Sequence, residues 1–228
     1  MKKTKLLPLI VLVLGLAACN SAHRHDNKSV YIEKSRLEAI ELAPAPQRGS
    51  PVDQADFIEL HDWQNKRTAQ QCAAAGAEGN AYLEDFFGHL KPFSAPLPAA
   101  GNKFILRVRE DASTAVTIFK DRNSRPRPFL SDAALDPCIG RAGGLAYPSG
   151  HATLSRLFAL MLTELAPLRR SEFMAVADAA ALNRVIGGVH HPSDIEAGKK
   201  LGDLLFARFM ENPEFRANMD KLRPYMAK

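Results

Sequence analysis

The sequence predicts an all-α protein built as a single-domain helical bundle. Apolar residues recur at helical spacing in several segments, and no segment shows the alternation of apolar and polar residues that marks a half-buried strand. The 228 residues fit one domain of ordinary size. Of these residues, 46% are hydrophobic and 24% are charged, which is the composition of a globular rather than a disordered chain.

The chain begins with a predicted lipoprotein signal peptide over residues 1–18. Three lysines precede an apolar stretch, residues 6–16, which is short for a membrane-spanning helix. The Leu-Ala-Ala-Cys that follows and ends at Cys19 resembles the lipobox of bacterial lipoproteins, in which the cysteine is acylated and becomes the new N-terminus. The alternative is a plain signal peptide with an incidental Cys19.

Residues 19–34 are expected to form the lipidated cysteine and a flexible tether, and residues 35–228 the folded domain. Asn20 resembles the outer-membrane sorting pattern of enteric-type bacteria. We therefore expect the domain on the periplasmic face of a bacterial membrane, the outer membrane by this signal, held by its lipid anchor. The remaining cysteines, Cys72 and Cys138, are expected to pair in this oxidising compartment; the alternative is two buried thiols.

The charge of the chain favours a small anionic partner over a nucleic acid. The formal net charge is +5, but three lysines lie in the predicted signal peptide, so the mature chain is only mildly basic. No run of Lys or Arg interleaved with aromatic residues is present to follow a nucleic-acid backbone. A modest positive excess suits an anionic small substrate. A homo-oligomer is compatible with the sequence.

The first half of the domain is expected to hold helices separated by proline-rich connections. The helices are expected at residues 35–42, 51–75 and 81–87, with connections at residues 43–51 and 92–98. The start of the second helix is the clearest, because Ser50 can cap it and Pro51 suits its first position. Asp53, three residues after the cap, completes a shortened capping box.

The second half shows the strongest helical periodicity. Helices are expected at about residues 103–120, 154–165, 171–185 and 193–210. The helix over residues 154–165 is apolar on nearly every side and is therefore expected in the interior. The last helix opens with a capping-box pattern at Ser193, and its apolar stripe includes Gly198 and Gly202, which are small enough for close contact with another helix.

Three segments concentrate anion-binding or proton-transfer groups at predicted helix ends. The first runs from Lys120 to Pro128, where prolines hold the backbone extended at Arg127. A guanidinium presented on a rigid backbone suits bidentate binding of phosphate oxygens. On its own, such a segment is more often a solvated helix end.

The second segment is Tyr147-Pro148-Ser149-Gly150-His151, directly before the buried helix. Ser149 offers a hydroxyl, Gly150 lets backbone N–H groups approach a ligand, and the helix N-terminus favours negative charge. His151 is placed to give or take a proton. The alternative is that Ser149 only caps the helix and that His151 is a surface residue.

The third segment holds Arg184, His190 and Asp194 around a predicted helix break, because a Gly-Gly-Val stretch and Pro192 oppose a continuous helix. A carboxylate on one imidazole nitrogen fixes the tautomer and leaves the other nitrogen as a nucleophile. The alternative is a metal site that includes His191. Adjacent histidines point to different sides and no third ligand cluster is evident, so we expect no metal and no cofactor.

Together the three segments resemble the signature of the type 2 phosphatidic acid phosphatase superfamily. Its motifs are Lys-x6-Arg-Pro, Pro-Ser-Gly-His and Ser-Arg-x5-His-x3-Asp, and this chain has the same spacings at residues 120–128, 148–151 and 183–194. The superfamily also includes the vanadium haloperoxidases. Within it, the chain is similar to the bacterial class A non-specific acid phosphatases over most of its mature length. The resemblance implies a helical bundle of this kind.

The resemblance also implies a role for each motif residue in the hydrolysis of phosphate monoesters. His190 would attack phosphorus and form a phosphohistidine, Asp194 would orient His190, and His151 would protonate the leaving alcohol and then activate water. The phosphate would be held by Lys120, Arg127, Ser149, the backbone of Gly150 and Arg184. We expect no metal requirement, because three cations can supply the charge that metal ions supply elsewhere, and an acidic to near-neutral optimum.

Three positions depart from the superfamily pattern. Asn183 replaces the usual serine of the third motif, and Ala152 stands where threonine is common in class A members. His191 follows the nucleophile where an aromatic residue is more usual, and we expect it on the surface, with contact to the leaving group as the alternative. These changes leave the chemistry intact and the substrate range open.

Other functions remain as alternatives. An anchored enzyme could act on lipid phosphates or diphosphates such as lipid A or undecaprenyl diphosphate. A vanadium haloperoxidase shares the oxyanion pocket, but such proteins are usually much larger. A non-enzymatic, anion-binding lipoprotein fits least, because His151, Arg184, His190 and Asp194 are all present.

Overall fold

The computed structural model describes residues 31–227, and the predicted signal peptide and Cys19 lie outside the described residues. The α-helices are α1 (Lys34–Glu38), α2 (Pro51–Lys66), α3 (Ala69–Ala77), α4 (Leu83–Phe87), α5 (Ala99–Asn123), α6 (Pro128–Ser131), α7 (Gly150–Leu165), α8 (Arg170–Ile186), α9 (Pro192–Glu211) and α10 (Pro213–Asp220). Short 3-10 helices are η1 (Gly88–Leu90), η2 (Pro167–Arg169) and η3 (Arg223–Tyr225). The described residues contain no strand, only an isolated bridge between Phe93 and Met226, so the predicted all-α class is confirmed.

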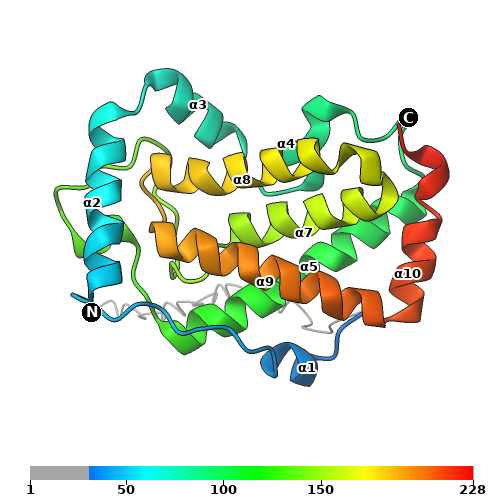
Figure 1. Cartoon of the computed structure of the whole chain (residues 1–228), viewed down its shortest axis with the longest axis horizontal. Coiled ribbons are helices and arrows are strands. Elements are labelled where there is room, and N and C mark those ends of the chain that lie inside the picture. The colour runs from blue at the N-terminus through cyan, green and yellow to red at the C-terminus, as the bar shows by residue number, and fades with distance from the viewer. Residues whose placement is uncertain (1–30, 228) are drawn as a thin grey trace, which may run out of the picture.

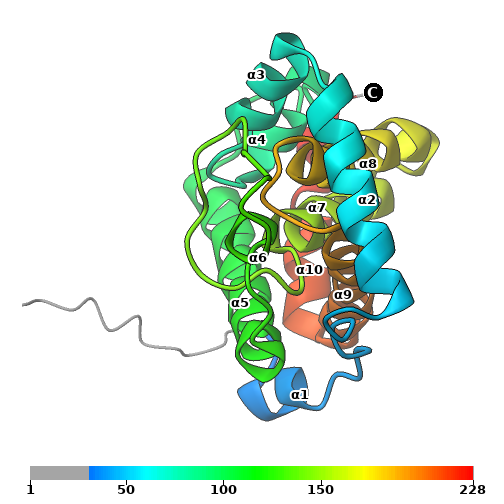
Figure 2. The ribbon, with the colours of Figure 1, turned by 90° about the vertical axis from the view of Figure 1, so that its left-hand side faces the viewer.

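Helix α7 is the centre of the bundle. It lies between α8 and α9, and α5 packs against it as well (Figure 1). Helix α2 stands across one end of the bundle, against α8 and α9, and α10 stands across the other end (Figure 1, Figure 2). The N-terminus of α7 and the loop between α8 and α9 lie at the α2 end, which is where the predicted site residues gather.

The core follows the apolar stripes that the sequence predicts. The stripe of α5 is buried at Phe104, Ile105, Val108, Ala112, Ala115, Val116 and Phe119. Helix α7 is buried on nearly every side, as expected, and its Phe158 is fully buried. Burial of such large apolar side chains is the main favourable term that holds the helices together.

Two glycines let α9 lie directly against α7. A Cβ atom at Gly198 would come within 2.6 Å of the main-chain oxygen of Ser149, and one at Gly202 within 2.8 Å of that of Thr153. Near the same crossing, the main-chain N–H of Ser149 donates to the main-chain oxygen of Asp194 at 2.9 Å. The start of α7 is therefore fixed against the start of α9, and both starts carry predicted site residues.

The helix predicted over residues 51–75 is two helices, which is a correction. Arg67 adopts an extended conformation, and Thr68 then begins α3 with a capping box, accepting from the N–H of Gln71 while the Gln71 side chain accepts from the N–H of Thr68. The Thr-x-x-Gln pattern at Thr68 was a start signal inside the predicted helix. At the start of α2, Ser50 accepts from the N–H of Asp53, as predicted.

Other boundaries differ from the prediction in smaller ways. Helix α9 is capped by His191 rather than Ser193, with Asp194 at the third helical position. Helices α6 and α10 were not predicted, and each begins with a proline at its first position. Helix α1 is shorter than the predicted helix over residues 35–42.

The ordered domain begins before residue 35. Tyr31, which the sequence places in the tether, is buried and packs edge-to-face against Phe104 and Phe215. The main-chain N–H groups of Tyr31 and Ile32 both donate to the Asp111 carboxylate. The domain therefore includes the last residues of the predicted tether.

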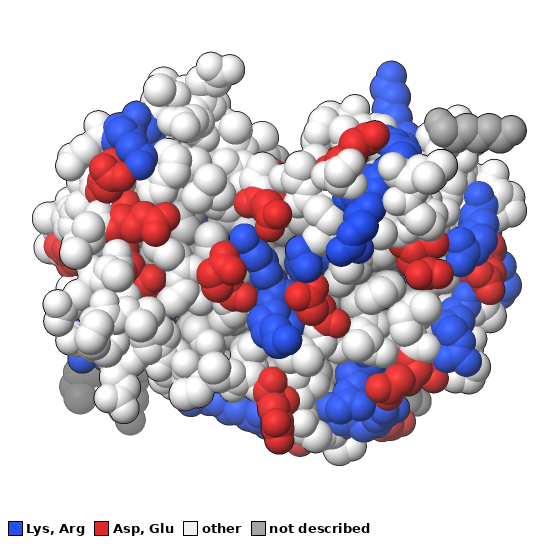
Figure 3. Space-filling view, in the orientation of Figure 1, with Lys and Arg blue, Asp and Glu red and all other residues white. Residues whose placement is uncertain are grey.

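The surface carries charges of both signs, and Figure 3 shows them interspersed on one face of the molecule. Arg156 pairs with Asp203 at 2.6 Å, and Lys199 pairs with Asp178 at 3.2 Å and with Glu196 at 3.0 Å. Within residues 31–227, no helix is both long enough and apolar enough to cross a bilayer.

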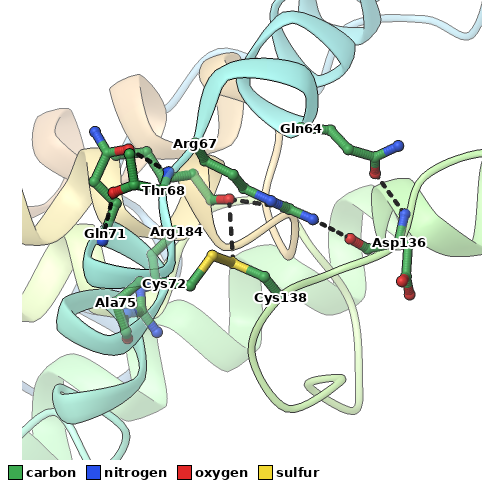
Figure 4. Close-up of a disulfide and its surroundings, with 10 residues drawn as sticks. Gln64, Arg67, Thr68, Gln71, Cys72, Ala75, Asp136, Cys138 and Arg184 are labelled. Carbon is green, nitrogen blue, oxygen red and sulfur yellow. Dashed lines mark hydrogen bonds between the residues drawn. A yellow bond between two sulfur atoms is a disulfide. The ribbon is translucent and has the colours of Figure 1, made fainter.

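The structure contains the predicted disulfide between Cys72 of α3 and Cys138 of the loop before α7 (Figure 4). The two Cα atoms are 5.8 Å apart, and 66 residues separate the cysteines in sequence. Next to the bond, Arg67 donates to the main-chain oxygens of Ile186 and Asp136. The bond and these contacts fasten α3 and the loop to the end of α8.

We expect replacement of both Cys72 and Cys138 by serine to lower the free energy of unfolding by about 2–4 kcal/mol. The bond closes a long loop, so its removal gives the unfolded chain more conformational entropy. Urea unfolding of the oxidised protein and of the double variant measures the difference. Equal midpoints and equal slopes would show that the bond does not stabilise this fold.

Candidate active site

The three predicted segments meet at the α2 end of the bundle. Lys120 comes from the last turn of α5, and Arg127 from the loop that follows it. Ser149 and His151 belong to the start of α7. Arg184 lies in the last turn of α8, and His190 and Asp194 lie on the two sides of the break before α9, where Gly188 takes a positive φ of 78°. These motif residues therefore come from the ends of α5, α7, α8 and α9 and from two of the loops between helices, but they share one region.

His190 is held between Asp194 and Arg127. Its Nδ1 lies 3.3 Å from Oδ2 of Asp194, and its Nε2 lies 2.6 Å from Nη1 of Arg127. A guanidinium can only donate and an ionised carboxylate can only accept. The proton of His190 is therefore assigned to Nδ1, and Nε2 carries a lone pair.

Burial keeps His190 neutral. The side chain is almost completely buried, and this burial lowers the pKa of His190 to about 3. Asp194 raises the pKa, whereas the positive charges of Arg127 and Lys120 lower it further. A neutral imidazole that carries its lone pair on Nε2 is the form required of a nucleophile.

Asp194 is fully buried and accepts several hydrogen bonds. Besides His190, its Oδ2 accepts from both the main-chain N–H and Nδ1 of His191 at 2.8 Å, and its Oδ1 accepts from Nη1 of Arg125 at 2.8 Å. Burial alone would raise the pKa of Asp194, but the hydrogen bonds from His190 and His191 hold it well below the usual range. Asp194 is therefore ionised wherever the protein is folded near neutral pH.

Lys120 and Arg127 supply positive charge beside His190. Arg127 is buried and donates to the main-chain oxygens of Gly143, Gly144 and Val189, which fixes its guanidinium. Lys120 donates to the main-chain oxygen of Leu145 at 2.5 Å. Burial and the charge of Arg127 lower the pKa of Lys120 to about 8.

Arg184 is the third cation of the motifs, and it is buried. It donates through Nη2 to the main-chain oxygen of Ala75 and pairs with Glu78 at 3.4 Å. Its Nε is buried and has no hydrogen-bond partner in the protein. A buried donor without a partner is costly, so an acceptor brought by a ligand would be favourable at this position.

Helix α7 presents Ser149 and His151. Ser149 is fully buried and caps α7, accepting from the N–H of Ala152. A Cβ at Gly150 would make only ordinary contact, 3.6 Å from Cγ1 of Val116, so packing within the protein does not require glycine there. The missing side chain is instead consistent with close approach of a ligand to the backbone.

His151 is half-buried rather than on the surface. Its Nε2 donates to the main-chain oxygen of Glu78 at 3.0 Å, and its ring packs edge-to-face on Phe86. Burial and then the charge of Arg184 lower the pKa of His151 to about 4, and Arg127 and Lys120 act in the same direction. Arg184, Arg127 and Lys120 therefore lie close enough to His151 to lower its pKa.

Arg125 is a central residue that the sequence analysis did not identify. Its Nη2 donates to Asp53 and to Asp56 of α2, each at 2.8 Å, and its Nη1 donates to Ser193 at 2.7 Å as well as to Asp194. The guanidinium and all three carboxylates are buried. Arg125 thus joins α2 to the carboxylate that lies beside Nδ1 of His190. The one sequence signal for this network is the Asp-x-x-Asp spacing of Asp53 and Asp56 in α2.

His191 is not on the surface, which corrects the prediction. The residue is only 1% exposed, its Nδ1 binds Asp194, and its ring packs edge-to-face on Phe57 at 5.3 Å. The reason is its place as the cap of α9, which turns its side chain back toward the third helical position. His190 and His191 therefore share one carboxylate.

One region of the chain, which includes the three motif segments, matches a known protein family. Residues 108–216 match the model of the PAP2 superfamily. The chain carries a PAP2 superfamily domain. Among described proteins, it is 29% identical over 202 residues to the non-specific acid phosphatase of Providencia stuartii, covering 82% of this chain and 79% of that protein. It is 26% identical to the acid phosphatase of Zymomonas mobilis subsp. mobilis, covering 96% of this chain and 86% of that protein.

A shorter similarity links the PAP2 domain to a lipid-directed enzyme. Over 66 residues it is 38% identical to the lipid A 1-phosphatase of Rhizobium etli, covering 29% of this chain and 28% of that protein. The chain is thus homologous to acid phosphatases over most of its length and is similar over a shorter segment to a lipid A 1-phosphatase.

Solved structures show the same fold. A bacterial vanadium-dependent iodoperoxidase has a TM-score of 0.59 at 20% identity, covering 77% of this chain and 54% of the iodoperoxidase. A transmembrane PAP2-type phosphatidylglycerolphosphate phosphatase from Bacillus subtilis has a TM-score of 0.52 at 18% identity, covering 72% and 87% of the two chains. At these identities the likeness concerns the helical fold alone. Residues 31–227 of this chain contain no group of three or more His, Cys, Asp or Glu side chains placed to hold a metal ion.

Proposed function

We propose that this PAP2 domain is an acid phosphatase that hydrolyses phosphate monoesters through a phosphohistidine on His190, without a metal ion. The observation that carries the proposal is the neutral His190, whose Nε2 lone pair faces the guanidinium of Arg127. The similarity to acid phosphatases over most of the chain supports the same reaction.

The first step transfers the phosphoryl group to His190. Lys120, Arg127 and Arg184 neutralise the phosphate oxygens, and the Nε2 lone pair of His190 attacks phosphorus. The N–P bond forms as the P–O bond to the alcohol breaks, and His151 gives its proton to the departing oxygen. The imidazole becomes positively charged in this step, and the buried carboxylate of Asp194 stabilises that charge.

The second step returns the enzyme to its starting state. His151, now neutral, accepts a proton from water as the water oxygen attacks phosphorus. The N–P bond breaks, its electron pair returns to Nε2 of His190, and inorganic phosphate leaves. The three cations provide in both steps the electrostatic stabilisation on which phosphoryl transfer depends.

Substrate binding controls the protonation of His151. In the protein alone, burial and the three cations lower the pKa of His151 to about 4. A bound phosphate group places negative charge among those cations and therefore favours the protonated imidazole. The bound substrate thus promotes the protonated form of His151 that the reaction needs, and we therefore expect an acidic to near-neutral optimum.

Phosphate binding should weaken as the pH rises through about 8, the pKa of Lys120. Loss of that proton removes one of the cations that hold the anion, and we expect the inhibition constant of inorganic phosphate to rise about tenfold. In the Lys120→Arg variant the cation persists, so the rise should move to higher pH. Inhibition constants measured across the alkaline range test this, and identical profiles for the two proteins would contradict the assignment of Lys120.

Turnover of para-nitrophenyl phosphate by the mature protein tests the proposed function. With EDTA present at acidic to neutral pH, we expect steady turnover that vanadate inhibits, because vanadate can take the place of phosphate among the cations. Activity that EDTA abolishes would contradict the metal-free mechanism. No turnover by folded protein would contradict the monoesterase function.

Lipid phosphates and diphosphates are the second candidate substrates. The segment shared with a lipid A 1-phosphatase and the predicted anchor at Cys19 favour this candidate. We also propose that the lipidated Cys19 holds the enzyme on the periplasmic face of the outer membrane. If so, Cys19→Ser should release the protein from the membrane fraction of a bacterial host.

A further inference from the structure

Glu78 lies outside the sequence motifs but contacts two residues to which the proposed reaction gives roles. It caps the C-terminus of α3. Its Oε2 lies 3.4 Å from Nη2 of Arg184, and its main-chain oxygen accepts from Nε2 of His151 at 3.0 Å. Glu78 therefore borders both a phosphate-binding cation and the proposed general acid.

The Glu78 carboxylate is held in place. Its Oε1 accepts from Nδ2 of Asn183 at 3.1 Å, and its side chain is only 15% exposed. Asn183 stands where the superfamily pattern has serine, and its amide reaches one bond further than a serine hydroxyl. Two contacts fix α3, the helix that ends at Glu78 (Figure 4). One is the hydrogen bond from Arg184 to the main-chain oxygen of Ala75, and the other is the disulfide of Cys72.

Several charged groups face this carboxylate. They are Arg184 of α8, Asp85 of α4 and His89 of η1. His151 of α7 contacts the main-chain oxygen of Glu78 instead of the carboxylate. Burial raises the pKa of Glu78 and Asp85 adds to the rise, whereas the hydrogen bond from Asn183 and the charges of Arg184 and His89 lower it; the pKa is raised on balance. Glu78 therefore takes up a proton at a higher pH than an ordinary glutamate does.

Glu78 lies on the side of the site where the leaving group is expected. In-line transfer places the attacking and leaving atoms on opposite sides of phosphorus. His190 is the attacking group, so the leaving oxygen lies on the side of His151, which is the side that Glu78 borders. A negatively charged leaving group would come close to a half-buried carboxylate, where repulsion is screened less than in water.

Building on the proposed function, we propose that Glu78 is a specificity-determining residue: it selects monoesters with an uncharged or cationic leaving alcohol and disfavours anionic leaving groups, diphosphates among them. Of the two substrate classes considered above, Glu78 therefore favours monoesters over diphosphates. The selection weakens at low pH, where protonation of Glu78 removes the repulsion.

A matched pair of substrates tests this role. Phenyl phosphate and 4-carboxyphenyl phosphate differ by one negative charge on the leaving group. We expect the ratio of their kcat/KM values to favour phenyl phosphate by about tenfold at about pH 7.5 and to shrink as the pH is lowered and Glu78 takes up a proton. In Glu78→Gln the ratio should be near one throughout that range. Glu84→Gln, which removes an exposed carboxylate of α4, should keep the wild-type ratio.

The outcomes distinguish a failure of the specificity role of Glu78 from a failure of the proposed phosphatase function. A wild-type ratio in Glu78→Gln, with phenyl phosphate still hydrolysed, would overturn the role of Glu78 and leave the phosphatase intact. Should Glu78→Gln fail to fold, the wild-type protein still decides, because a ratio near one at about pH 7.5 contradicts the role. No hydrolysis of phenyl phosphate by the wild type would overturn the proposed function and the role together.

Discussion

Replacement of His190 by alanine is expected to lower kcat by at least about a thousandfold, which corresponds to about 4 kcal/mol of activation free energy. The variant keeps the three cations but has no lone pair to form the N–P bond. Steady-state kinetics on para-nitrophenyl phosphate measures the loss. Thermal unfolding of the same sample separates lost chemistry from lost fold, because His190 is buried.

A second histidine provides the matched control. His61 pairs with Asp132 at 2.7 Å and is partly exposed, so His61→Ala removes an imidazole from outside the motif residues. We expect wild-type kcat for that variant. If folded His190→Ala retained even a tenth of the wild-type kcat, His190 could not be the nucleophile.

Replacement of Arg125 by methionine is expected to lower the free energy of unfolding by about 3–5 kcal/mol. The change leaves Asp53, Asp56 and Asp194 buried without their shared cation. Activity should fall as well, since Asp194 would no longer be fixed from its far side. Urea unfolding measures the stability, and kinetics on the folded fraction measures the activity.

Two comparisons make the Arg125 prediction specific. Adding Asp53→Asn to Arg125→Met removes one unpaired charge, so it should recover part of the lost stability. Arg156→Met breaks the more exposed pair with Asp203 and should cost no more than about 1 kcal/mol. Equal losses for Arg125→Met and Arg156→Met would show that the buried network has no special contribution.

Much of the fold could be predicted from local sequence patterns. The stripes of α5, α7 and α9 predicted long buried helices, and Gly198 and Gly202 predicted the close crossing of α9 that the structure contains. The break at Arg67 was missed although Thr68 carried a start signal, because no proline or glycine marks the end of α2.

The parts of the site that could not be predicted depend on tertiary contacts. Asp56 and Arg125 are distant in sequence, and they meet only because α2 stands across the end of the bundle. His191 was expected on the surface because sequence alone did not show that it caps α9. Glu78 reaches Arg184 through the packing of α3 on α8, for which no motif exists.

The most direct test of the central claim is to trap the covalent intermediate. Protein mixed with a rapidly hydrolysed phosphate ester, quenched in base because phosphohistidine is labile to acid, is digested and analysed by mass spectrometry. We predict one phosphoryl group on the peptide that contains His190, and none at that peptide in His190→Ala. A phosphoryl group on another residue, or full turnover without any labelled peptide at comparable time resolution, would contradict the account.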